Sequence, residues 1–136
     1  MSSKFLLAVL AAFAVLFVVD WLWFGIIFKD WFMQRMPSNQ ESIPLHALGE
    51  LCLAVLLAIA FPMGYKGGSA VMEGARFGLL MGLIYQLPGA IHMYASMGGS
   101  RGIPVFFIAH GVIVGILAGV AIAMVYAKKA AAPAQP

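Results

Sequence analysis

The chain lacks charge, and this lack decides which solvent it can fold in. Charged residues make up 10% of its 136 residues, whereas 63% are hydrophobic. An ordinary soluble domain carries about 25% charged residues. With so few charged residues, the chain cannot cover an exterior that faces water. We therefore predict an integral membrane protein whose main partner is the lipid bilayer. The net charge of +3 is spread along the chain, and it forms no basic patch for nucleic acid.

Several chemical motifs are also missing from the sequence. Cys52 is the single cysteine, so the chain cannot form an internal disulfide. The chain has no Ser-His-Asp order with a nucleophile elbow and no cysteine motif for haem attachment. We therefore assign no catalytic residues. The alternative of a small membrane enzyme stays open, because His46 and Glu50 could act as acid and base on a lipid-soluble substrate.

Four long apolar segments are present, each long enough to cross about 30 Å of hydrocarbon as a helix. They lie at residues 4–28, 43–63, 70–97 and 103–127. The first is a retained span rather than a signal peptide, because its apolar character continues past Asp20 and no A-x-A-like site follows. The expected fold is all-α, a four-transmembrane-helix antiparallel bundle that forms one domain over residues 1–129. A mobile tail is expected at 130–136.

The basic residues predict which way this bundle faces. The side with both termini has five of them, Lys4, Lys66, Arg76, Lys128 and Lys129, against three on the other side, Lys29, Arg35 and Arg101. The positive-inside rule then places both termini in the cytoplasm. The expected location is the inner membrane of a bacterium. The connections at residues 29–42 and 98–102 would face the periplasm of a Gram-negative cell.

Glycines recur every four residues in the third and fourth segments. They form two stripes, Gly74, Gly78 and Gly82 in the third and Gly111, Gly115 and Gly119 in the fourth. Small residues at this spacing let two membrane helices approach closely. The stripes therefore predict a tightly packed antiparallel hairpin.

Five ionisable side chains fall in the outer half of the expected bundle. They are Asp20, His46, Glu50, His92 and His110, and they come from four different segments. His46 and Glu50 are four residues apart, so they share one helical face. Imidazole and carboxylate are ligands of Zn, Fe and Mn. The pattern predicts an outward-facing polar pocket that holds a divalent metal or a small ligand, with Tyr85 and Gln86 as further ligand or floor groups.

Other interpretations of these residues stay open. The polar groups could pair with one another, for example Asp20 or Glu50 with His110, without binding anything. His92 and His110 could also be axial ligands of haem or chlorophyll. In a third interpretation the chain is an accessory subunit of a larger respiratory or photosynthetic membrane complex, or a homo-oligomer. Its glycine stripes and aromatic residues would then be docking surfaces.

The end of the first segment is rich in aromatic residues. They are Trp21, Trp23, Phe24, Phe28, Trp31 and Phe32, and they are expected to anchor the helix at the membrane interface. Trp23, Phe24, Gly25 and Phe28 form a W-aromatic-G-x-x-F pattern preceded by an acid, Asp20. This stretch and the Gly-rich second hairpin resemble small bacterial four-helix integral membrane proteins of a domain-of-unknown-function family. The resemblance implies the four-helix topology and no activity, and His46 and Glu50 lie outside its pattern.

Overall fold

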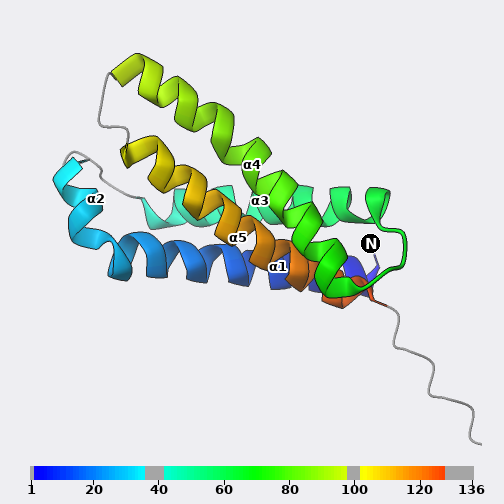
Figure 1. Cartoon of the computed structure of the whole chain (residues 1–136). Coiled ribbons are helices and arrows are strands. Elements are labelled where there is room, and N and C mark those ends of the chain that lie inside the picture. The colour runs from blue at the N-terminus through cyan, green and yellow to red at the C-terminus, as the bar shows by residue number, and fades with distance from the viewer. Residues whose placement is uncertain (1, 36–41, 98–101, 128–136) are drawn as a thin grey trace, which may run out of the picture.

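The computed structural model describes residues 2–35, 42–97 and 102–127, and these residues are helical almost throughout (Figure 1). The elements are α1 (Ser3–Leu22), the π-helix η1 (Trp23–Ile27), α2 (Lys29–Arg35), α3 (Ile43–Gly64), α4 (Ala70–Met97) and α5 (Gly102–Tyr126). No strand occurs in these ranges, which confirms the all-α class. With η1 counted as part of the first helix, the four long helices begin and end within one residue of the expected segments. The tail at 130–136 lies outside the described residues, as do Arg101, Lys128 and Lys129.

Three of the helices are long and apolar enough to cross a membrane. They are Ser3–Ile27 (α1 with η1), Ile43–Gly64 and Gly102–Tyr126. The fourth helix, α4, is the longest at 28 residues, but it is not one of the three. Its composition is less apolar, because Glu73, Arg76, Gln86 and His92 are distributed along it. The sequence expectation of four similar spans is therefore supported for α1, α3 and α5 only.

The apolar core lies between α1, α3 and α5 and is built largely from small residues. Ala8, Ala12, Ala54, Ala58 and Ala118 are completely buried. Alanine at these contacts lets the helix backbones approach closely. The core joins the first half of α1 to the second halves of α3 and α5. Both α3 and α5 therefore run antiparallel to α1 and parallel to each other, and their first halves come together around the second half of α1.

Helix α4 packs against α5 through the two glycine stripes. A Cβ atom added to Gly74 would lie 2.6 Å from the carbonyl oxygen of Gly119, and Gly78 and Gly82 meet the backbones of Gly115 and Gly111 even more closely. Real Cβ contacts are almost never that short, so these positions exclude any side chain. Among the described residues, α4 has no comparable contact with α1 or α3. In Figure 1 the C-terminal half of α4 rises away from both of them.

The connection after α1 is more ordered than the sequence suggested. Residues 29–42 were expected to be a polar connection, but Lys29–Arg35 forms helix α2. Between α1 and α2 the chain makes a π-turn, in which the Phe28 N–H donates to the carbonyl of Trp23 at 2.9 Å. Helix α2 then lies against α5, where the rings of Trp31 and Phe106 stack with centroids 4.3 Å apart. Helix α2 is therefore stabilised by aromatic packing against α5.

Candidate metal centre

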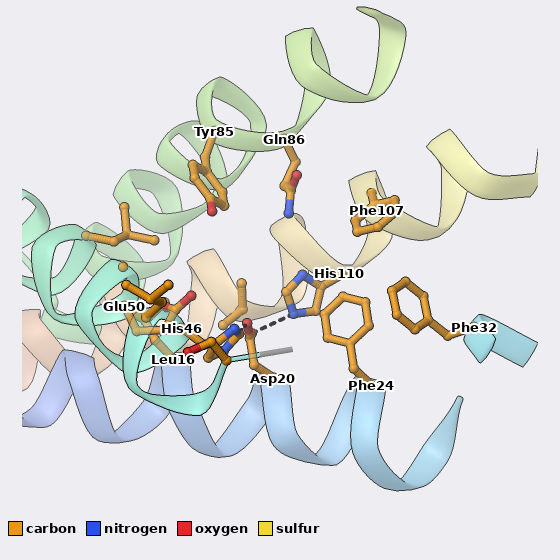
Figure 2. Close-up of a pocket in the computed structure, with 15 residues that line it drawn as sticks. Leu16, Asp20, Phe24, Phe32, His46, Glu50, Tyr85, Gln86, Phe107 and His110 are labelled. Atoms are coloured by element: carbon orange, nitrogen blue, oxygen red, sulfur yellow. Dashed lines mark hydrogen bonds and ion pairs between the residues drawn. The ribbon is translucent and has the colours of Figure 1, made fainter. Parts of the chain in front are cut away.

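Asp20 is the residue on which the candidate site is built. It lies near the end of α1 and is 8% exposed. Its Oδ1 is 2.8 Å from Nε2 of His110 on α5, and its Oδ2 is 3.4 Å from Nε2 of His46 on α3 (Figure 2). One carboxylate therefore contacts histidines from both of the helices that run antiparallel to α1.

Glu50 adds a second carboxylate to this cluster. It lies one helical turn after His46 on α3 and is 8% exposed, so its carboxylate is largely withdrawn from solvent. Ligand atoms of Asp20, His46 and Glu50 all lie within 4.8 Å of one another. Three side chains that can each donate a lone pair to a metal thus meet at one point between α1 and α3.

These three side chains fit a divalent cation in both donor type and spacing. Imidazole nitrogen and carboxylate oxygen bind Zn²⁺ at about 2.0–2.2 Å, so ligands of one ion lie about 3–4 Å apart. The ligand atoms already lie within 4.8 Å of one another, so small side-chain adjustments bring them to that spacing. The charge also fits, since two buried carboxylates repel each other strongly in a medium of low dielectric constant. A cation between Asp20 and Glu50 would turn that repulsion into attraction.

His110 is the most deeply buried polar residue of the site, with 3% exposure. Because a carboxylate only accepts hydrogen bonds, Nε2 of His110 is the atom that donates to Asp20. Its other nitrogen, Nδ1, is buried and has no hydrogen-bond partner among the described residues. The ring is held by Phe24, with centroids 4.9 Å apart, and by Trp23, with centroids 5.5 Å apart.

A cavity of about 550 Å³ opens beside the cluster, between the α1–α3 pair and the α4–α5 hairpin. Its polar lining residues are Asp20, Ser42, His46, Glu50, Tyr85, Gln86 and His110. Figure 2 shows Tyr85 pointing from α4 toward Glu50 and His46, and Gln86 pointing toward His110, whose Nδ1 faces the side where Gln86 lies. The cavity exists because α4 diverges from α1 and α3 at this level.

The structure brings together most of the side chains that the sequence singled out. Asp20, His46, Glu50 and His110 meet at the cluster, and Tyr85 and Gln86 line the cavity beside it. His92 is not brought there. It is exposed on α4, six residues beyond Gln86, on the part of the helix that has diverged from α1 and α3. The expected pairing of His92 with His110 as axial ligands of a macrocycle is therefore not seen in this arrangement.

Three phenylalanines form a wall of the cavity that sequence inspection did not predict. Phe24 and Phe32 were expected to be interfacial anchors, and Phe107 was not singled out, yet all three line the cavity. Phe107 could have been found, because it lies three residues before His110 and so shares its helical face. The position of Phe32 depends on the π-turn and α2, which no sequence pattern indicated.

The chain was also compared with protein-family models, curated proteins and solved structures, and none of the three comparisons finds a match. The described part of the chain is all-helical, with three helices able to span a membrane and an Asp/His/Glu group able to hold a metal ion. The function must be argued from this site.

Proposed function

We propose that the protein is an integral membrane protein that binds one divalent metal ion between Asp20, His46 and Glu50. The observation that carries the proposal is the convergence of these three donors within 4.8 Å, with both carboxylates 8% exposed. Buried ionisable groups in a membrane protein are costly and mark functional sites. The close pairing with His110 involves Asp20, and Glu50 is a second buried acid in the same cluster.

His110 supports the metal ligands rather than joining them. By donating from Nε2 to Oδ1 of Asp20, it fixes the orientation of that carboxylate and leaves Oδ2 directed toward His46. Hydrogen bonds of this kind to a metal-binding carboxylate commonly change metal affinity by 10–100-fold when they are removed. When bound, the metal would supply Lewis acidity at the edge of the cavity.

The proposed topology has four membrane crossings, with α4 as the fourth. Two contacts support it: Tyr126 near the end of α5 donates to the carbonyl of Ala58 late in α3, at 3.3 Å, whereas Asp20 joins the early parts of both helices. Parallel α3 and α5 start on the same side, so the chain between them has to return across the membrane. At about 1.5 Å per residue, α4 is roughly 42 Å long and can make that return.

Four crossings place both termini on one side, and the larger number of basic residues there supports a cytoplasmic location. The metal cluster and the cavity would then lie in the outer half of a bacterial inner membrane, facing the periplasm. We further propose that the chain is related to the small bacterial four-helix membrane proteins that it resembles at residues 20–28.

The metal proposal is tested by Glu50→Gln, with His92→Gln as the matched control. The first change removes one ligand charge with little change in shape, and the second alters an exposed histidine outside the cavity. Purified protein in lipid nanodiscs is titrated with Zn²⁺ and Mn²⁺ by calorimetry, and bound metal is counted by elemental analysis. We expect one ion per chain in the wild type and the control, and at least a tenfold weaker affinity in Glu50→Gln. Equal affinity in all three proteins, or no metal binding by the wild type, would refute the proposal.

A further inference from the structure

The cavity is much larger than a metal ion requires. One water molecule occupies about 30 Å³ in the liquid, whereas the cavity measures about 550 Å³. Cavities of roughly 300–1,000 Å³ are typical of sites for organic ligands. The space beside Asp20 and Glu50 therefore has room for an organic molecule whether or not an ion is bound.

The walls of the cavity are of two kinds. Phe24, Phe32 and Phe107 lie close together on one side, with ring centroids 5.9 Å apart for Phe24 and Phe107 and 6.3 Å apart for Phe32 and Phe107. His110 and Gln86 supply polar atoms beside them. Aromatic faces of this kind favour another aromatic ring, and the adjacent polar atoms favour a ring that carries a hydrogen-bonding group.

His110 specifies which hydrogen-bonding group that is. Nε2 donates to Asp20, so in the neutral ring Nδ1 keeps its lone pair and can only accept. This atom is buried and has no partner among the described residues. An unsatisfied buried acceptor is destabilising, and a ligand that donates a hydrogen bond removes that penalty. The missing group is thus a donor, such as a hydroxyl.

The cavity has exposed lining residues on both α3 and α4, and these two helices have few contacts with each other among the described residues. Leu45 on α3 is 69% exposed and Tyr85 on α4 is 55% exposed, and both also line the cavity. With α4 crossing the membrane as proposed, side chains exposed between α3 and α4 would face lipid. A molecule that reaches the cavity between α3 and α4 must therefore be soluble in the bilayer.

We propose that the cavity binds a lipid-soluble phenol, whose hydroxyl donates to Nδ1 of His110 while its ring packs against Phe24 and Phe107. Its apolar tail leaves the cavity between α3 and α4, past Leu45 and Tyr85. The phenol uses different atoms from the metal ion, so this inference does not require the ion, and it rests only on the proposed membrane crossing of α4.

The experiment measures the binding of radiolabelled 4-octylphenol to the full chain in lipid nanodiscs, with empty nanodiscs as the blank. EDTA is present throughout, so that a failure of the metal proposal leaves the result unaffected. The matched probe is 4-octylanisole, in which the hydroxyl is methylated and cannot donate. We expect saturable binding of one 4-octylphenol per chain and at least tenfold weaker binding of 4-octylanisole. Equal affinity for the two probes, or no saturable binding of the phenol, would overturn the proposal.

Two pairs of variants locate the bound phenol. His110→Phe keeps an aromatic ring but removes the acceptor, and His92→Phe makes the same change at the exposed histidine outside the cavity. Gly49→Leu places a side chain in the cavity, because Gly49 lines it and no atom lies within 4 Å of an added Cβ. Gly89→Leu makes the same change at an equally open position of α4 that does not line the cavity.

We expect His110→Phe and Gly49→Leu to weaken 4-octylphenol binding at least tenfold and the two controls to bind like the wild type. Wild-type affinity in either cavity variant would overturn the assignment to this cavity. If His110→Phe does not fold, two tests remain. Gly49→Leu is expected to fold, because leucine is a good helix former. The comparison of 4-octylphenol with 4-octylanisole uses the wild-type protein and needs no mutation.

Discussion

At the scale of single residues, Asp20 joins three helices through one carboxylate. It contacts His110 on α5 and His46 on α3 from its position on α1. Hydrogen bonds between a carboxylate and imidazole are stronger than those between neutral groups, and breaking one leaves a buried nitrogen without a partner. The same side chain is thus expected to contribute to both stability and metal binding.

Asp20→Ala is expected to destabilise the protein by about 3 kcal/mol, because it leaves buried Nε2 of His110 unpaired. The matched control is Asp30→Ala on α2, where the side chain is exposed and the expected change is below about 0.5 kcal/mol. Unfolding by a denaturing detergent, followed by circular dichroism, measures both. Equal stability of Asp20→Ala and the wild type would show that the carboxylate does not hold the helices together.

At this scale the sequence was informative, because ionisable side chains are rare in apolar segments and stand out. Asp20, Glu50 and His110 could be singled out from chemistry alone. Their pairing could not be assigned, since the sequence leaves either acid free to bond His110. Only the rotation of α1 and α3 about their axes decides that Asp20 is the partner.

At the scale of helices, the two glycine stripes determine how α4 meets α5. Gly78 lies against the backbone of Gly115, closer than any Cβ would permit. A methyl group there must push the helices apart along their whole contact, because backbone atoms cannot rotate away. This contact also sets the direction in which α4 leaves the bundle, and so it fixes the width of the cavity.

Gly78→Ala is therefore expected to destabilise the protein by about 1–3 kcal/mol. Gly89→Ala is the matched control, because no atom lies within 4 Å of the added Cβ. At this open position alanine is expected to stabilise the helix by about 0.5–1 kcal/mol. Detergent-induced unfolding of the two variants under the same conditions measures the difference. Similar stability changes in both would mean that the glycines are not a packing surface.

The helices differ in how well the sequence predicts them. The long helices can be predicted from the length of the apolar segments, and the contact between α4 and α5 can be predicted from glycines spaced by four residues. The π-turn at Trp23–Ile27 was missed, because the apolar run continues through it without a proline or a charge. Helix α2 was missed for the opposite reason, because Lys29, Asp30 and Arg35 made its residues look like a polar connection. Their geometry comes from packing of Trp31 and Phe32 on α5, which is a tertiary effect.

At the scale of the whole molecule, the sequence predicts depth along each helix but not the tilt of the helices. His92 was grouped with Asp20 and His110 because all three fall in the outer half of their segments. That argument assumes helices that stay side by side. The C-terminal half of α4 follows the glycine contact with α5 and rises away from α1 and α3 (Figure 1). His92 lies in this half of α4 and does not line the cavity beside the cluster.

The crossing of α4 is the whole-molecule feature on which the topology depends, and cysteine labelling tests it. In a Cys52→Ala background, single cysteines replace Lys66 before α4 and Ser96 near its end. Spheroplasts of a Gram-negative host are treated with a membrane-impermeant maleimide. Because parallel α3 and α5 require α4 to return across the bilayer, we expect Ser96→Cys to be labelled directly and Lys66→Cys only after permeabilisation.

Asp30→Cys on α2 serves as the positional control, because its side is set by the crossing of α1 and does not depend on α4. Direct labelling of Lys66→Cys together with protection of Ser96→Cys would show that α4 crosses the membrane in the opposite orientation. Labelling of both ends from one side would show that α4 does not cross. The cavity would then open to water along α4 rather than to lipid. A lipid-soluble ligand would lose its route between α3 and α4, so the position of this one helix decides what kind of molecule can reach His110.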